Sequence, residues 1–330
     1  MFDHLPRSRF IVALRALLVS AVCIPLFAMA QTWPAKPVRM LVPFPPGGGV
    51  DFAARIVGKH LADRLGQPVV IENRAGANGI IALEALKNAA PDGYTLAAAS
   101  NGPLVINPSI YLKLPYDPLR DFVAIGRLVD FPLLLVTHPS LPANSVPELI
   151  ALARAKPGVL TYSSPGVGNG SHLAVELFAS MANVSLVHVP YKGTAPAATA
   201  LLAGEVSFTI SSIPTVLPHI RAGKLRALAV GNAKRLPALP EFPTLAESGV
   251  PGYEAFSWAG LIAPAGTPKD VVARLNREAV QILKQRDIVD QLARDGTLAA
   301  PDTPEEFDAY IKAELDKWAR IVQLAKIKPE

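Results

Sequence analysis

Short apolar runs alternate along this chain with stretches in which apolar residues recur every three or four positions. The first unit is an apolar run at residues 38–44, followed after a glycine-rich turn by a helical pattern at residues 50–65. Apolar residues at that spacing lie on one face of a helix, whereas a short β-branched run fits a buried strand. Repeated units of strand, loop and helix predict a parallel sheet covered by helices.

The same patterns predict the other elements. Further strands are expected at residues 69–71, 94–99, 160–163, 184–189, 206–211, 225–230 and 256–263. Further helices are expected at residues 79–88, 145–155, 172–181, 196–202, 218–222, 268–284 and 304–326. The last helix carries an apolar stripe, which we expect to pack in the core rather than to bind a cofactor or a partner.

One apolar run, at residues 122–138, is too long for an ordinary strand. We interpret it as a strand that crosses between two lobes near Asp130, and a proline-rich stretch at residues 236–252 returns the chain to the first lobe. A chain of 330 residues also exceeds the usual size of a single core. The expected domains are lobe I, residues 31–130 and 252–330, and lobe II, residues 131–251. A cleft between two lobes is a preferred ligand site.

The N-terminal segment, residues 1–30, has the three parts of a secretory signal peptide. Arg7 and Arg9 precede a short apolar run that ends in the small-x-small triplet at residues 28–30. We expect cleavage after Ala30 and export to a periplasm, the alternative being a single N-terminal anchor helix. The lone cysteine, Cys23, lies in the removed segment, which excludes disulfides, thiol catalysis and cysteine metal sites in the mature protein.

Charge and histidine spacing exclude two further classes of function. Cleavage leaves 29 basic and 26 acidic residues, and a net charge of +3 without a dense basic patch does not indicate nucleic-acid binding. None of the five remaining histidines has the spacing of a metal site. We interpret them as packing or surface residues: His60, His138, His172, His188 and His219.

A glycine-rich loop at residues 44–51 follows the first predicted strand and begins a helix. Ligands of open α/β sheets bind at the carboxyl ends of the strands. Free N–H groups at the start of a helix, together with its dipole, favour an anion there. Asp51 is expected to serve the first turn of the helix rather than the ligand. The alternative is a plain glycine-rich turn.

A second loop, at residues 163–172, has the same arrangement and adds the hydroxyls of Ser163, Ser164 and Ser171. Its glycines resemble a dinucleotide fingerprint, but Ser171 stands at the last glycine position and the expected downstream acid is missing. Ser171 and His172 do not form a catalytic pair, because neighbours on a helix point in different directions.

Single polar residues follow three other strands. Lys192 could offset ligand charge, the alternative being a solvated surface lysine, and Ser100, Asn101 and Ser211 stand at strand ends. Backbone N–H groups, hydroxyls and one lysine suit an oxyanion. They do not supply the base, nucleophile or metal that turnover needs, so the sequence indicates binding without a cofactor, not catalysis.

A series of short motifs runs along nearly the whole chain after the first thirty residues, at residues 33–34, 37–39, 44–51, 71–79, 91–96, 107–108, 162–178, 189–197, 242–254 and 263–268. In this order they resemble the Bug family, the extracytoplasmic solute receptors of tripartite tricarboxylate transporters. The resemblance implies an α/β, two-lobed periplasmic binding protein of type II, a Venus flytrap with a parallel-rich sheet in each lobe. It also implies a small carboxylate ligand, one large and one small membrane subunit as partners, and we expect a monomer that binds no nucleic acid.

The loops and the resemblance together give the expected ligand-binding residues. They are Phe44, Pro46, Gly47, Gly48, Gly49, Ser100, Asn101, Ser163, Ser164, Gly168, Asn169, Ser171, His172, Lys192 and Ser211. No catalytic residue and no metal ligand is expected.

One departure from the family concerns Ala200, which stands where relatives often carry an Asp. If that Asp contacts the ligand in relatives, this chain should favour a mono- or dicarboxylate without an amino group. Two other functions stay open at this point: a receptor that feeds a signalling system, and a secreted α/β enzyme, since a fold alone does not determine a function.

Overall fold

The computed structural model describes residues 33–294, 296–324 and 327. The predicted signal peptide, residues 1–30, lies outside them. Residues 36–330 form one unit that contains all the strands and helices considered below. Among the described residues, no helix combines the length and the apolar character needed to cross a membrane.

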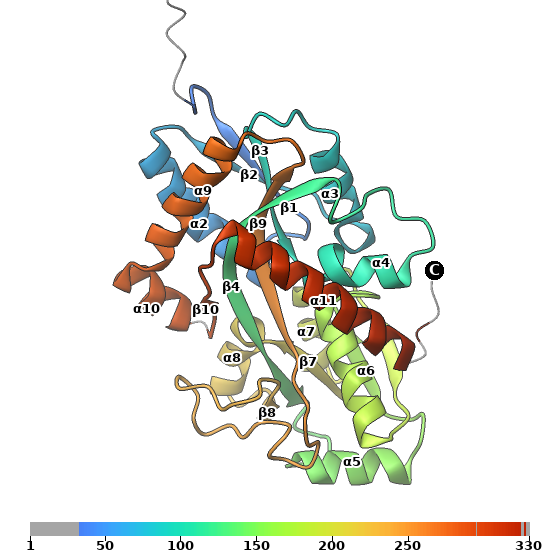
Figure 1. The fold of residues 1–330 in the computed structure, drawn as a ribbon. Coiled ribbons are helices and arrows are strands. Elements are labelled where there is room, and N and C mark those ends of the chain that lie inside the picture. Colours follow the sequence, from blue (N-terminus) through green and yellow to red (C-terminus); the bar gives the residue numbers. More distant parts are fainter. Residues whose placement is uncertain (1–32, 295, 325–326, 328–330) are drawn as a thin grey trace, which may run out of the picture. The chain divides into compact units, whose positions relative to one another are not determined.

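Strands and helices alternate along most of this unit (Figure 1). The strands are β1 Val38–Val42, β2 Val69–Asn73, β3 Thr95–Ser100, β4 Phe122–Thr137, β5 Thr161–Ser164, β6 Val187–Pro190, β7 Phe208–Ser212, β8 Arg226–Val230, β9 Phe256–Pro264 and β10 Leu298–Ala299. The helices are α2 Gly49–Leu65, α3 Ile80–Lys87, α4 Asn107–Ile110, α5 Val146–Ala155, α6 Gly170–Ala182, α7 Thr194–Leu202, α8 Ile213–Arg221, α9 Lys269–Leu283, α10 Arg286–Arg294 and α11 Pro304–Leu324. Two single turns are η1 Ala77–Gly79 and η2 Gly102–Ile106.

The strands form one sheet in the order β2-β1-β3-β9-β4-β7-β5-β6, with β8 and β10 also paired to β4. Both ends of the sheet are parallel, as β1 pairs with β2 and β3 and β5 pairs with β6 and β7. The centre is antiparallel, where β9 runs beside β4 (Figure 1). The parallel ends agree with the expected strand, loop and helix units.

The long strand β4 changes partners within its length. Its residues up to Pro132 pair with β9, and from Leu133 onward it pairs with β7 and β8. The sequence predicted a crossing near Asp130, and the change of partners occurs there. Each half of β4 therefore belongs to a different set of strands.

Clusters of buried apolar side chains pack around β4. One contains side chains of β3, α3, η2 and α11, including Phe307 and Trp318. A second contains residues of α5, α6 and β7. A third contains residues of α8 together with Leu236 and Leu239. Trp318 is fully buried, which confirms the predicted packing of the last helix. Loss of such a side chain would cost about 3–5 kcal/mol.

The structure differs from the predicted elements in a few places. Helix α8 begins at Ile213 rather than at residue 218, because Pro214 lies in its first turn, where a proline removes no helical hydrogen bond. The buried turns η2 and α4 were not predicted, since Pro103 and Pro108 interrupt any helical pattern in so short a segment. The short elements α10 and β10 were also missed.

Candidate functional site

A small cavity lies where strands β3 and β7 end and several helices begin. We call it the inner cavity, and its volume is about 50 Å³. Apolar side chains and small polar groups line it together. The lining residues are Phe44, Gly48, Gly49, Val50, Ser100, Phe131, Leu133, Asn169, Ser171, Thr194, Ser212 and Ser257.

Four helices point their N-termini at the inner cavity. Gly48 precedes α2, Asn169 precedes α6, Thr194 begins α7 and Ser212 precedes α8. No side chain caps α2, α7 or α8, so their first-turn N–H groups remain available to a ligand. The positive ends of four helix dipoles therefore meet in one small space, which favours an anion.

The polar side chains of the inner cavity are neutral. They are the hydroxyls of Ser100, Ser171, Thr194, Ser212 and Ser257 and the amide of Asn169, and none of the described lining residues is charged. Nor does the described part of the chain contain a group of three or more side chains that could hold a metal ion. This set can donate hydrogen bonds to a carboxylate.

The carboxylate of Asp51 stabilises the glycine-rich loop that leads into α2. It accepts hydrogen bonds from the Gly47 N–H at 3.0 Å, from Arg55 Nε at 3.0 Å and from Asn73 Nδ2 at 2.8 Å. Burial opposes ionisation, but these hydrogen bonds outweigh it and lower the pKa of Asp51. Gly47 has a φ of +87°, a conformation that favours glycine. Asp51, which was expected to serve the first turn of the helix, thus supports the loop that precedes it, and it is not among the residues that line the inner cavity.

The serine-rich loop that leads into α6, residues 163–172, is supported by a pair of stacked histidines. The rings of His172 and His188 lie 4.0 Å apart between centroids, and Tyr162 stacks on His188 at 4.8 Å. The Gly168 N–H donates to His172 Nδ1 at 3.1 Å, and His188 Nε2 lies 2.6 Å from Ser164 Oγ. Burial lowers the pKa of His172 to about 3, with a further contribution from His188, and burial lowers that of His188 to about 4. Both rings are therefore neutral near neutral pH.

The two sides of the cleft approach each other closely. A Cβ atom on Gly170, at the start of α6, would lie 2.7 Å from Asn101 Nδ2, and one on Gly48 would lie 4.0 Å from Thr194 Oγ1. Asn101 is 1% exposed, and its Oδ1 accepts a hydrogen bond from Ser257 Oγ at 2.9 Å. Its Nδ2 is one of the buried polar atoms without a partner among the described residues. Gly170 and Gly48 therefore each lie close to a residue from the other side of the inner cavity.

A larger cavity of about 620 Å³ also lies between residues from both sides of the partner change in β4. We call it the outer vestibule. It is lined mainly by prolines, glycines and aromatic side chains. The lining residues are Pro43, Phe44, Pro45, Ala75, Gly76, Ala77, Asn78, Gly79, Tyr111, Pro165, Gly166, Val167, Tyr191, Lys192 and Gly193.

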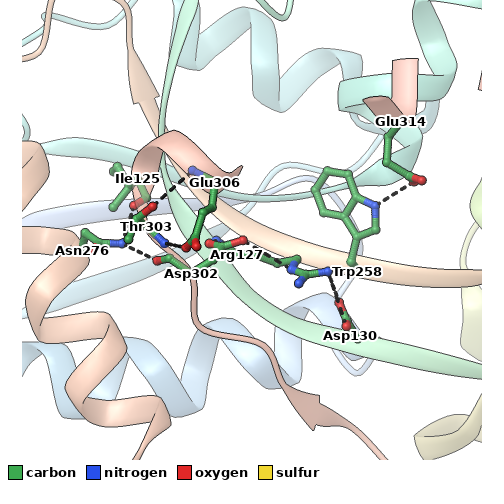
Figure 2. A network of polar contacts seen from close by, with 9 residues as sticks. All are labelled: Ile125, Arg127, Asp130, Trp258, Asn276, Asp302, Thr303, Glu306 and Glu314. Atoms are coloured by element: carbon green, nitrogen blue, oxygen red, sulfur yellow. Dashed lines mark hydrogen bonds and ion pairs between the residues drawn. The ribbon is translucent and has the colours of Figure 1, made fainter. Parts of the chain in front are cut away.

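A polar network surrounds Arg127 on the crossing strand β4. Figure 2 shows Arg127 between Asp130, whose Oδ1 lies 3.2 Å from Arg127 Nη1, and Asp302, whose Oδ1 accepts from the Arg127 N–H at 2.6 Å. Burial and the negative charges of Asp302 and Glu314 raise the pKa of Asp130 to about 6, although Arg127 opposes the shift. The network attaches the segment before α11 to β4.

Some of the predicted ligand-binding residues line one of the two cavities, and others line neither. The inner cavity is lined by Phe44, Gly48, Gly49, Ser100, Asn169 and Ser171, and Phe44 and Lys192 line the outer vestibule. Eight predicted residues line neither cavity: Pro46, Gly47, Asn101, Ser163, Ser164, Gly168, His172 and Ser211. Several of these form the supporting contacts; Ser163 Oγ, for example, donates to the Ala197 carbonyl at 3.0 Å.

Six lining residues were not predicted: Val50, Phe131, Leu133, Thr194, Ser212 and Ser257. Two of them had a usable signal. Ser212 follows Ser211 at the same strand end, and Thr194 begins the helix after Lys192. Ala200, the position of the family's frequent Asp, is 3% exposed on α7 and is not among the residues that line either cavity.

Comparison with known proteins identifies the family of this chain. Residues 53–327 match the family model described as the tripartite tricarboxylate transporter family receptor. The chain is 40% identical to Protein BugT of Bordetella pertussis over 89% of this chain and 90% of that protein.

Solved structures with bound carboxylates have the same fold. Rpa4515 of R. palustris with adipate is 38% identical and has a TM-score of 0.88, over 90% of this chain and 100% of that one. MatC from Rhodopseudomonas palustris with bound malate is 32% identical and has a TM-score of 0.83, over 88% of this chain and all of that one. The structural neighbours include periplasmic binding proteins, which confirms the predicted two-lobed α/β fold. The chain therefore belongs to the family of tripartite tricarboxylate transporter receptors that the sequence motifs indicated.

Proposed function

We propose that this chain is a periplasmic receptor that captures a small carboxylate in the inner cavity and delivers it to a tripartite transporter. The observation that carries the proposal is the convergence of four helix N-termini and five hydroxyls on a small space lined by no charged side chain. A carboxylate fits this environment because it accepts several hydrogen bonds and is stabilised by the helix dipoles.

The chemistry of the ligand is supported by the solved relatives. Rpa4515 and MatC contain adipate and malate, which are both dicarboxylates. Their similarity to this chain extends over nearly the whole fold, so a carboxylate is the ligand class we propose here. We further propose that the ligand has no amino group, because neither cavity is lined by an acidic side chain among the described residues.

We also propose that the chain divides into lobe I, residues 31–130 and 252–330, and lobe II, residues 131–251. The change of partners within β4 supports this division. The inner cavity is lined from both lobes, by Gly48 and Ser100 on one side and by Ser171 and Thr194 on the other. A ligand that contacts both sides at once stabilises the closed arrangement and shifts the population toward it.

Export, partners and the absence of catalysis complete the proposal. The N-terminal sequence supports cleavage after Ala30 and a periplasmic location. Membership of the receptor family supports one large and one small membrane subunit as partners of a monomeric receptor. The neutral lining of the inner cavity supports binding without turnover.

The experiment that tests this function is thermal unfolding of the mature protein, residues 31–330, after unfolding and refolding to remove any retained ligand. The panel contains mono-, di- and tricarboxylates and amino acids. A ligand that binds only the folded state raises the midpoint with the logarithm of its concentration over its dissociation constant. We expect a shift with carboxylates and a smaller one in Ser171→Ala. A shift only with uncharged solutes or amines would contradict the proposal.

A further inference from the structure

One hydroxyl of the inner cavity already uses its hydrogen atom within the protein. Ser257 Oγ donates a hydrogen bond to Asn101 Oδ1 at 2.9 Å. Asn101 is buried and is not among the residues that line the inner cavity. The hydrogen atom of the Ser257 hydroxyl therefore points away from the inner cavity, and Oγ presents its lone pairs to a ligand.

The orientation of the Asn101 amide fixes this arrangement. Asn101 Oδ1 also accepts a hydrogen bond from the Gly102 N–H at 3.1 Å. Turning the amide over would place Nδ2 against that N–H, so that two donors would face each other. Asn101 is therefore a positioning residue, because it keeps the Ser257 hydroxyl in the role of an acceptor.

Most of the other polar side chains of the inner cavity are free to donate. Within the described part of the chain, the hydroxyls of Ser100, Ser171 and Thr194 have no hydrogen-bond partner in the protein. Asn169 Oδ1 accepts from the Ser171 N–H at 2.9 Å, which leaves Asn169 Nδ2 as a donor. These groups can bind a carboxylate. Ser257 Oγ cannot, because it and a carboxylate oxygen both present lone pairs.

An acid in the inner cavity therefore needs a hydrogen atom of its own for Ser257. The volume of about 50 Å³ holds on the order of four water molecules, so this donor must lie close to the carboxylate. A hydroxyl on the neighbouring carbon meets both conditions. An ammonium group would also donate, but none of the described lining residues is acidic and could balance its charge. An acid without a donor leaves Ser257 Oγ without a partner, which weakens binding.

We infer that the receptor selects a hydroxyl group next to the bound carboxylate, with Ser257 as the specificity residue that accepts its hydrogen. The inference rests on the proposed function and adds to it a group other than the carboxylate. It does not follow from the ligand class of the relatives, since the adipate in the Rpa4515 structure carries no hydroxyl. It follows from the hydrogen bond between Ser257 and Asn101 in this chain.

Isothermal titration near neutral pH tests the inference with matched acids of two lengths. Lactate, propanoate, pyruvate and alanine have the same carbon skeleton and differ only in the group on the carbon next to the carboxylate. A longer set contains 2-hydroxyglutarate, glutarate and 2-oxoglutarate. We expect the wild type to bind the better enantiomer of the hydroxy acid about fivefold more tightly than the parent acid, the size of one neutral hydrogen bond. The oxo acid should gain nothing, because its added oxygen can only accept.

Three variants assign this preference to residues. Ser257→Ala removes the acceptor and should abolish the preference for the hydroxy acid. Asn101→Ala frees the Ser257 hydroxyl to donate, so it should reduce the preference by improving the binding of the parent acid, which a merely structural loss would not do. Ser171→Ala is the matched control. It removes a donor to the carboxylate, so it should weaken the hydroxy acid and the parent acid alike and keep their ratio.

The possible outcomes separate the two proposals. A wild type that binds the hydroxy acid and the parent acid equally, or that favours the oxo or the amino acid, overturns the inference and leaves the carboxylate receptor standing. A preference that survives in Ser257→Ala overturns it as well. Should another carboxylate of the thermal panel bind instead, its own hydroxy, parent and oxo forms give the same comparison. If no carboxylate binds the wild type, the proposed function fails and this inference fails with it.

Discussion

The backbone N–H of Gly168 donates to Nδ1 of His172, four residues along the chain, at 3.1 Å. The imidazole of His172 thereby acts as an acceptor inside the serine-rich loop, and its Nδ1 carries no proton in this arrangement. The loop positions Asn169 and Ser171 at the inner cavity. A buried histidine thus sets the shape of the site without lining it.

Replacing this acceptor should weaken both the fold and ligand binding. In His172→Phe the Gly168 N–H would lose its buried acceptor, at a cost of about 1–3 kcal/mol in the free energy of unfolding. His172→Asn retains an acceptor oxygen near the same position and should lose less. Urea unfolding measures the loss of stability, and titration with a carboxylate ligand measures the loss of affinity. Equal losses in both variants would show that ring packing, rather than this hydrogen bond, supports the loop.

The histidine pair also predicts how stability depends on pH. The pKa values of His172 and His188 are lowered to about 3 and about 4, whereas an unfolded histidine titrates near 6.5. Lowered values in the folded state mean that the unfolded chain takes up protons first. The stability from these two groups is therefore complete above about pH 6.5 and is lost as the pH falls toward 4 and then 3.

Urea unfolding at several pH values checks this prediction. The free energy of unfolding of the wild type should fall between about pH 6.5 and 4, at up to about 1.4 kcal/mol per pH unit for each histidine. The variant His172→Asn/His188→Asn should start from a lower stability near neutral pH and fall less steeply. His60→Asn, on the partly exposed side of α2, serves as the control. A slope that does not change in the double variant would exclude the histidine pair as its source.

Asp130 should act in the opposite direction. Its pKa is raised to about 6 in the folded state, so the folded chain holds this proton more tightly than the unfolded one. The fold is therefore least stable when Asp130 is ionised. The free energy of unfolding falls by up to about 3 kcal/mol as the pH rises from about 4 to 6. Asp130→Asn removes that loss and leaves Arg127 paired with Asp302. We expect the variant to gain stability relative to the wild type near pH 7 and to show little difference near pH 4. A destabilised variant at both values would mean that the ion pair with Arg127 dominates.

Asp51 is expected to matter for binding through the glycine-rich loop. Asp51→Ala removes the acceptor of the Gly47 N–H and of Arg55 and Asn73, and the loss of a buried, hydrogen-bonded carboxylate should cost about 2–4 kcal/mol. Ligand affinity should fall as well, because the N-terminus of α2 would no longer be held in place. Asp63→Ala, an exposed acid on the same helix, is the matched control. If a folded Asp51→Ala variant kept normal affinity, the hydrogen bonds of Asp51 would not be needed to position the loop for ligand binding.

Much of this architecture could be predicted from local patterns, because each loop of the site combines a strand end, small residues and a helix start. Gly48 and Ser171 were found in this way. Phe131, Leu133 and Ser257 were not, since they reach the inner cavity through the pairing of β4 with β9 and β7, and that register depends on residues far apart in the sequence. The stack of His172 on His188 was missed for the same reason, as the two rings come from α6 and β6.

Substitutions of Gly48 test closure of the cleft, whichever class of ligand the protein binds. Its φ is −87°, which any residue can adopt, and the nearest atom to an added Cβ is Thr194 Oγ1 at 4.0 Å, across the cleft. Gly48→Ala should therefore fold normally and bind nearly as the wild type does. Gly48→Leu should also fold, but its larger side chain would fill the space between the two sides and lower affinity by at least about tenfold, which corresponds to about 1.4 kcal/mol. Small-angle scattering with and without ligand measures closure directly, and we expect the ligand to compact the wild type and Gly48→Ala but not Gly48→Leu. Compaction of Gly48→Leu to the same extent, with unchanged affinity, would show that the inner cavity does not need this approach of Gly48 to Thr194.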